Sequence, residues 1–289
     1  MAESPSHRFG QYLGELLEAL FLPEVKAFCQ GRDLYLDCGG PRPIRPGRKL
    51  TWTDRYGNNH DLDFVIEKGG TAERQGRPLA FIEAAWRRYT KHSKNKAQEI
   101  QGAVLPIAEK YDIDRPFLGA VLAGEFTGNS IEQLRSVGFT LVHIPYRDIV
   151  GAFGKVGIDV AFDEGTPDSW FHAVLRRIEA AGPAMEKHII ATLRDLHRGQ
   201  FDTFFERLHK KLARHVEGIG VTALFGQDVH FVSVDDAVGH LQAGLPPSRP
   251  GLTFLRHEIS VRYSNGDHIR ASFADPGEAV AFLRYAAAQ

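Results

Sequence analysis

The sequence is poor in cysteine and has neither a long apolar run nor an excess of charge of one sign. Its two cysteines, Cys29 and Cys38, are too few for a disulfide framework, which favours the reducing cytoplasm. The longest uncharged apolar run, 117–124, has the length of a strand, whereas a helix that crosses a bilayer needs about 20 residues. Residues 1–5 lack the basic flank and apolar stretch of a secretory signal. We therefore expect a cytoplasmic protein that does not associate with membranes.

The charges are balanced, with 35 Lys and Arg against 36 Asp and Glu and a net charge of −1. This balance excludes a protein that is basic overall and binds nucleic acid through its whole surface, although it leaves room for a local basic patch. The hydrophobic content of 43% and the charged content of 25% are those of a globular protein and exclude a disordered chain, a collagen-like fibre and a coiled coil. The length of 289 residues allows one large domain or two smaller ones.

Several familiar catalytic and binding motifs are also missing. The sequence has no GxxxxGK[ST] or GxGxxG phosphate loop and no GxSxG nucleophile motif. Its 13 histidines include no HExxH pair, and neither cysteine belongs to a CxxC pair, so a zinc site is not indicated.

The order of the predicted elements indicates a mixed central sheet flanked by helices, an α/β fold. A Pro- and Gly-rich loop at 38–47 separates the first helix from the first strand. Apolar periodicity and turn signals predict helices over 9–28, 94–111 and 130–137 (with Ser130 as its N-cap) and strands over 49–56, 60–67, 78–85, 117–123 and 139–144.

The rest of the chain divides into a helical segment and a small α+β module. We expect helices that begin at Asp168 as a cap and at Pro183, and a third over 200–216, whereas 219–289 favours short strands. Asn265-Gly266 predicts a hairpin turn, and Asp275, Pro276 and Glu278 have the order of a helix start. Residues 236–241 and 278–283 resemble each other, each after a strand, a similarity that chance alone could produce. The predicted domains are 1–165, 166–218 and 219–289.

Carboxylates on two neighbouring strands are the first functional signal. Asp61 and Asp63 share one face of their predicted strand, and Glu83 interrupts an otherwise apolar one. Burying a carboxylate costs several kcal/mol unless it has a partner, and two such charges ~4 Å apart repel by ~4 kcal/mol at an effective dielectric constant of 20. Either one acid is protonated or a cation lies between them, and Mg²⁺ prefers such oxygen ligands. The alternative is that Glu83 pairs with Arg87 or Arg88.

A basic run follows directly. Residues 86–96 hold no acid, two aromatic residues, and five basic residues: Arg87, Arg88, Lys91, Lys94 and Lys96. Such a run is often a solvated helix face, but basic residues in a first helical turn oppose the helix dipole. Beside a metal site, these cations would neutralise the phosphates of a nucleic acid.

An Asp on a hairpin strand, a Glu on the next strand, and a helix that carries Gln98 resemble the PD-(D/E)XK nuclease superfamily, restriction-endonuclease-like in fold. The residues that carry the resemblance are Asp63 (with Asp61 as its competitor), Phe81-Ile82-Glu83-Ala84-Ala85 and 94–98, and the match covers roughly 9–145. The resemblance implies that Asp63 and Glu83 bind Mg²⁺, or Mn²⁺ in its place, and that the backbone carbonyl of Ala84 helps. A further acid on the first helix would be Glu18, or alternatively Glu15.

The sequence departs from the family at Ala85, where the family has a lysine that positions the attacking water. Lys91, our first choice, or Lys94 or Lys96 could supply that amine, while Arg87 clamps a phosphate. We therefore expect a Mg²⁺-dependent endonuclease of restriction or phage-defence type that cleaves DNA, possible as a homodimer because cutting two strands needs two sites. The alternatives are an inactive relative that binds nucleic acid or a protein partner, and an α/β interaction protein in which Glu83 is paired structurally.

Overall fold

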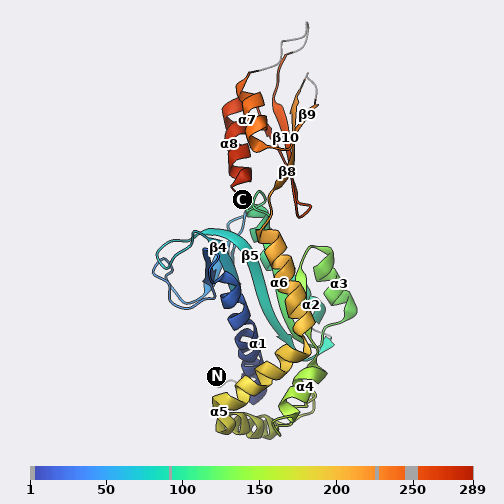
Figure 1. The fold of residues 1–289 in the computed structure, drawn as a ribbon. Coiled ribbons are helices and arrows are strands. Elements are labelled where there is room, and N and C mark those ends of the chain that lie inside the picture. The colour runs from blue at the N-terminus through green and yellow to red at the C-terminus, as the bar shows by residue number, and fades with distance from the viewer. Residues whose placement is uncertain (1–3, 91–92, 225–227, 245–252, 289) are drawn as a thin grey trace. The chain divides into compact units, whose positions relative to one another are not determined.

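A computed structural model describes residues 4–90, 93–224, 228–244 and 253–288. The chain forms two compact units (Figure 1). The first comprises residues 1–112 and 116–208, and the second comprises 113–115 and 209–289. The segment after 166 is therefore shared between them: its first two helices lie largely in the first unit, and the strands that follow lie in the second.

The first unit is built on a five-stranded mixed sheet, which confirms the predicted α/β class. Its strand order is β1-β4-β5-β6-β7, with antiparallel pairing of β1 to β4 and β4 to β5 and parallel pairing across β5, β6 and β7. A separate hairpin pairs β2 with β3. The strands are β1 Leu34–Asp37, β2 Leu50–Thr53, β3 Asn59–Leu62, β4 Phe64–Lys68, β5 Arg77–Arg87, β6 Phe117–Gly124 and β7 Thr140–Ile144.

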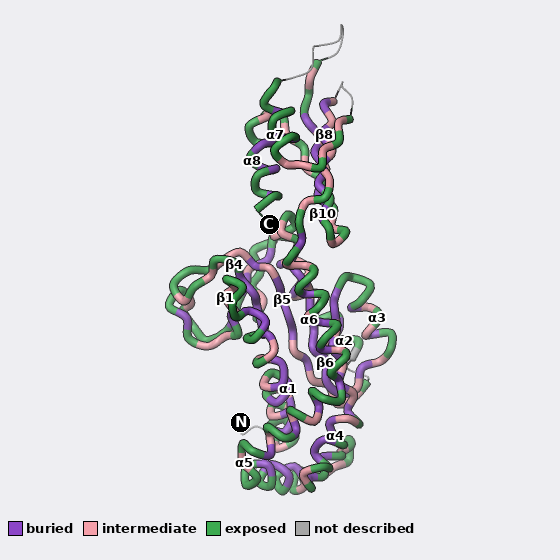
Figure 2. Tube along the Cα trace, in the orientation of Figure 1, coloured by how far each residue is buried: buried purple, intermediate pink, exposed green. Residues whose placement is uncertain are grey.

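Helices cover both faces of this sheet because successive side chains of each strand point to opposite sides. On one face, Phe81 and Leu122 belong to the same buried cluster as Ile100 of α2 and Leu134 of α3. On the other, α1 and α6 lie together (Figure 1), and Phe21 of α1 packs edge-on against the rings of β4 and α6. Figure 2 shows β5 and β6 as largely buried between these layers. The helices are α1 Pro5–Cys29, α2 Ser93–Lys110, α3 Gly128–Ser136, α4 Tyr146–Gly154, α5 Asp168–Leu196 and α6 Arg198–Leu212.

Several helix ends differ from the predicted ones. The N-cap of α3 is Thr127, whose hydroxyl accepts the amide of Ser130, so Ser130 is not the cap. Asp168 is the first residue of α5 and its N-cap is Pro167. The helix start predicted at Pro183 is confirmed: α5 consists of two helical segments separated at Gly182, whose φ of +69° and ψ of −172° are not helical and suit glycine.

One strand and one helix boundary are also corrected. The strand expected over 60–67 is interrupted at Asp63, which separates β3 from β4. The short edge strand β1 lies between the predicted helix and the predicted loop, where no element was predicted, and it pairs with β4. The helix expected over 200–216 ends at Leu212, and β8 begins at Val216.

The second unit repeats a strand–strand–helix arrangement twice. Its sheet order is β11-β10-β8-β9, and all its pairs are antiparallel. The similarity between 236–241 and 278–283 therefore falls on helices in equivalent positions. The elements are β8 Val216–Ala223, β9 Asp228–Phe231, α7 Val234–Gln242, β10 His257–Tyr263, β11 His268–Phe273 and α8 Pro276–Ala287.

The predicted hairpin and helix start of this unit are confirmed. Asn265-Gly266 lies in the turn between β10 and β11, with Gly266 at φ +86°. Asp275 caps α8 by accepting the Glu278 amide at 2.9 Å, and Pro276 is the first helical residue.

Candidate functional site

Glu83 is a buried carboxylate in the middle of the central sheet. It lies on β5, which pairs with β4 on one side and with β6 on the other, and it is 7% exposed. Its neighbours on the same strand face, Phe81 and Ala85, belong to the cluster that packs against α2. The alternation of the strand therefore turns Glu83 toward the face that α2 covers.

Asp63 lies directly opposite, at the interruption between β3 and β4. The antiparallel register pairs Phe64 with Ile82, so one further step along each strand brings Asp63 to Glu83. The Ala84 amide donates a 2.7 Å hydrogen bond to Asp63 Oδ2. The structure thus brings together the two acids that the sequence singled out. Asp63 lies outside the paired residues of β3 and β4, and its carboxylate accepts a hydrogen bond from a backbone amide of β5.

The two carboxylates share an unfavourable environment. Burial raises the pKa of Asp63, although the Ala84 hydrogen bond and the charge of Lys96 oppose that rise. Burial, followed by the charge of Asp63, raises the pKa of Glu83 to about 8. One oxygen of Glu83, Oε1, is buried without a hydrogen-bond partner. A buried acceptor without a partner is costly and calls for a ligand or a proton.

Lys96 is the cation that acts on both acids. It lowers the pKa of Asp63 and of Glu83, and its side chain is 21% exposed in the first turns of α2. Its ammonium lies 3.5 Å from Glu99, which also pairs with Arg87 at 3.3 Å. The first-choice lysine of the sequence analysis, Lys91, lies outside the described residues.

The sequence did not lead us to choose Lys96 over Lys91 as the lysine near the acids, although it contains a signal for Lys96. Lys96 lies four residues before Ile100, and both Ala97 and Ile100 are buried. Residues four apart lie on the same helix face, so helical spacing places Lys96 at the edge of the buried stripe. Lys94, two residues earlier, is exposed.

Glu18 of α1 is a third acid in this neighbourhood. Burial, then the charge of Asp63 and that of Glu15, raises the pKa of Glu18. Of the two candidates on α1, Glu18 therefore interacts with the site. Glu15 acts also on the phenol of Tyr12, whose pKa burial raises to about 12.

Three other predicted site residues have partners outside the acid pair. Asp61 is exposed on the β2–β3 hairpin, where it accepts from Lys49 Nζ at 2.6 Å and from Thr51 Oγ1 at 2.7 Å. Arg88 donates through Nε to the Phe162 carbonyl at 2.9 Å and stacks 3.9 Å from the centre of the Tyr146 ring. Arg87 keeps about a third of its side chain exposed and donates to the Trp86 carbonyl at 2.9 Å.

The donor set fits a hard divalent cation in part. Two opposed carboxylates with raised pKa values and an unpartnered oxygen match the oxygen ligands that Mg²⁺ or Mn²⁺ takes, and the Ala84 amide donates to one of them, Asp63. Within the described residues, no group of three or more His, Cys, Asp and Glu side chains is positioned to hold a metal ion. Asp63 and Glu83 are therefore the side chains that would hold one, and Glu18 adds negative potential nearby.

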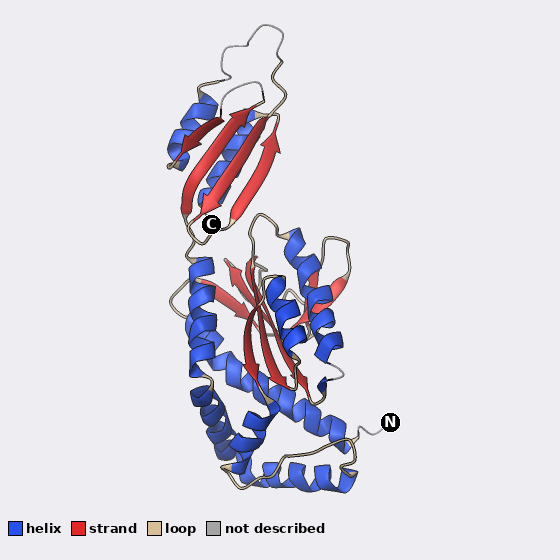
Figure 3. Ribbon diagram, turned by 90° about the vertical axis from the view of Figure 1, so that its right-hand side faces the viewer, coloured by secondary structure: helices blue, strands red, loops and turns tan. Residues whose placement is uncertain are grey.

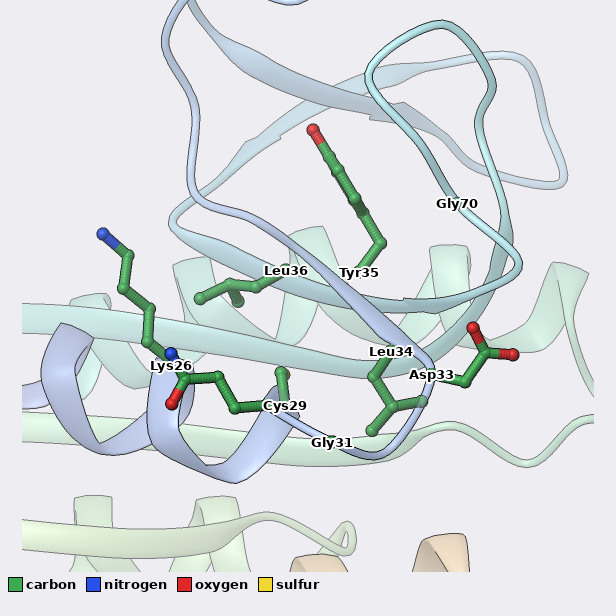
Figure 4. Close-up of a pocket in the computed structure, with 9 residues that line it drawn as sticks. Lys26, Cys29, Gly31, Asp33, Leu34, Tyr35, Leu36 and Gly70 are labelled. Atoms are coloured by element: carbon green, nitrogen blue, oxygen red, sulfur yellow. The ribbon is translucent and has the colours of Figure 1, made fainter.

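A cavity of about 490 Å³ between the end of α1 and β1 has different chemistry (Figure 4). It is lined by Lys26, Cys29, Asp33 and Tyr35, among others. Burial raises the pKa of the Cys29 thiol to about 11, so this thiol stays protonated and is a poor nucleophile.

No described helix is long and apolar enough to cross a membrane.

Comparison with known proteins adds little to this geometry. No protein-family model matches the chain, and no curated protein matches it. A solved structure titled as that of a protein of unknown function, AF1548, matches 65% of this chain and 98% of its own length, with 12% identity and a TM-score of 0.29. A score this low carries no information about fold or function.

Proposed function

We propose that the first unit is a metal-dependent nuclease with a restriction-endonuclease-like core, and that it hydrolyses phosphodiester bonds in DNA. The observation that supports this most is the Asp63–Glu83 pair with a common cation, Lys96. An acid pair held by a backbone amide, with an unpartnered oxygen and a nearby lysine, has the composition of a phosphodiesterase centre.

Each residue has a defined role in this proposal. Asp63 and Glu83 would hold Mg²⁺, which would supply a Lewis acid for the scissile phosphate and for a water molecule. The Lys96 ammonium orients the attacking water and neutralises charge that develops on the phosphate. Arg87, at the exposed end of β5, contacts an adjacent phosphate. Lys96 thus replaces the lysine that the family places where this chain has Ala85.

The direct test is plasmid cleavage with Mg²⁺ or Mn²⁺ by the wild-type protein and by Asp63→Asn and Glu83→Gln. Both substitutions keep the shape of the side chain and remove its charge. We expect each to abolish cleavage, by at least about 10³-fold, since removal of a metal ligand loses both the metal and its electrostatic stabilisation. Asp61→Asn is the matched control, because Asp61 is an acid on the adjoining strand that pairs with Lys49. Equal activity in all four proteins would refute the assignment.

The packing of Ala85 favours a second candidate, a protein that binds DNA through this unit without cutting it. Ala85 is 3% exposed within the cluster that packs on α2, so a lysine at this position would have no room. DNA binding without cleavage under any divalent metal would support this alternative.

A further inference from the structure

The sheet of the second unit has one covered face and one open face. Ile219, Val221, Ile259 and Val261 point toward α7 and α8 and form a buried cluster with them. In Figure 3 the two helices of this unit lie on one side of its four strands. Among the described residues of this unit, no element packs on the opposite face, whose side chains alternate with the buried ones.

The register places basic residues on that open face in two adjacent rows. One row crosses all four strands as Arg270, Ser260, Gly220 and His230. The next row contains His268, Arg262 and Gly218. Directly opposite residues in antiparallel strands have side chains on the same face, about 5 Å apart. Arg262, Arg270, His230 and His268 are all exposed.

These two rows contain no acid. Among the described residues, neither Arg262 nor Arg270 has an ion-pair partner. Side chains of the adjacent strands fill the space above the two glycines of β8: a Cβ at Gly218 would lie 3.4 Å from Arg262 Nη2, and a Cβ at Gly220 would lie 2.7 Å from Ser260 Oγ.

The third row of the same face contains the acids Glu258 and Asp228. Both acids accept hydrogen bonds from neighbouring side chains. Glu258 accepts from Ser272 at 2.6 Å and from Arg256 at 2.5 Å. Asp228 accepts from Thr222. The negative charge of Glu258 is thus paired with Arg256, Asp228 has a hydroxyl partner, and neither acid lies in the two basic rows.

We propose that these two basic rows bind the phosphate backbone of DNA and hold the substrate for the nuclease unit. The choice of DNA as the ligand rests on the function proposed above. The choice of this surface rests on charge complementarity. Arg262 on β10 and Arg270 on β11 occupy diagonally adjacent positions of the open face and offer separate anchors to successive phosphates. An acidic face would repel a polyanion, and a neutral face would not attract one.

The test is the salt dependence of DNA binding by the full-length protein, measured in EDTA by fluorescence anisotropy with a labelled duplex. Each phosphate contact contributes about 0.9 to the slope of log K against log salt. We expect Arg262→Ala and Arg270→Ala each to weaken binding roughly three- to tenfold at ~0.1 M salt and to reduce the slope by about 1. The double variant should reduce this slope by about 2.

Arg284→Ala is the control, since Arg284 is exposed on α8, which covers the other face. An unchanged affinity and slope in the double variant, or an equal loss in Arg284→Ala, would overturn the proposal. Circular dichroism melting of each variant shows whether a loss reflects unfolding. Because EDTA prevents cleavage, the two proposals fail separately: a wild-type protein that cuts DNA while the arginine variants bind normally refutes only the basic rows.

Discussion

The Ala84 amide donates a 2.7 Å hydrogen bond to Asp63 Oδ2, which ties the strand break at Asp63 to the residue beside Glu83. This bond holds the half-buried Asp63 carboxylate next to the buried one of Glu83 and uses no side chain at position 84. The separation of the two acids is therefore set by backbone register, and a one-residue slip of β4 against β5 would destroy the pair.

Lys96 is expected to contribute to catalysis more than to DNA binding. Lys96→Ala should reduce the cleavage rate by about 10²-fold or more, because a preorganised charge in a partly buried site stabilises the transition state far better than water does. Single-turnover cleavage at saturating protein measures the rate, and anisotropy measures binding. Lys94→Ala is the matched control, since Lys94 is the exposed lysine of the same turn. A rate for Lys96→Ala equal to that of the control would mean that Lys96 has no catalytic role.

The stability of the metal-free protein should fall as the pH rises from about 4.5 to about 8. Burial and the charge of Asp63 raise the pKa of Glu83 from its ordinary value of 4.5 to about 8, so in this window the folded protein binds more protons than the unfolded chain. Unfolding free energy then decreases with pH. Glu83→Gln should remove this component and be more stable than wild type at pH 8, by an amount on the order of a few kcal/mol.

Urea unfolding in EDTA at pH 5, 6.5 and 8 measures this difference. The quantity of interest is the wild-type minus variant free energy, because other titrating groups cancel in it. A difference that stays constant with pH would contradict the raised pKa of Glu83. Addition of Mn²⁺ at pH 8 should restore the stability of wild type and leave Glu83→Gln unaffected.

Glu18 should tune the metal affinity of the site without being essential. Glu18→Gln removes one negative charge that acts on Asp63, so we expect a weaker Mn²⁺ affinity, by roughly three- to tenfold, and retained cleavage at high Mn²⁺. Glu15→Gln, one turn earlier on α1, is the control. Complete loss of cleavage in Glu18→Gln at saturating Mn²⁺ would make it a ligand instead.

A buried arginine at the sheet edge should be important for folding. Arg42 donates to Asp37 Oδ2 at 2.6 Å and to Glu67 Oε1 at 2.7 Å, and all three side chains are under 5% exposed. Arg42→Ala leaves the buried Glu67 without its cation and leaves Asp37 with Arg45 alone, and it should cost about 3–5 kcal/mol. Urea unfolding measures the loss. Lys49→Ala breaks an exposed pair and should leave the unfolding midpoint nearly unchanged; a similar midpoint in both variants would contradict the account.

The sequence predicted those parts of the fold that depend on local signals. Strand β6 is a continuous apolar run in the sequence. Asn265-Gly266 specifies the turn between β10 and β11, and Asp275 supplies the side chain that caps α8. Asp63 and Glu83 were recognisable because acids interrupt or flank apolar strands, and this pattern does not depend on tertiary detail.

What the sequence could not give depends on packing between distant segments. β1 is four residues long and is a strand because β4 lies beside it. The position of Asp63 outside the ladder follows from the Ala84 hydrogen bond, which no local pattern encodes. Arg42 lies in a Pro- and Gly-rich loop, and its partners are on two different strands. Lys96 was one of three lysines of the same run, and only its burial on α2 separates it from Lys94.

The most direct measurement is an anomalous difference map from a crystal soaked in Mn²⁺. The account predicts a peak about 2.0–2.3 Å from carboxylate oxygens of both Asp63 and Glu83, and its loss in a soaked Glu83→Gln crystal. Carboxylates that remain unliganded at saturating Mn²⁺, or a peak bound only by exposed acids elsewhere, would contradict it.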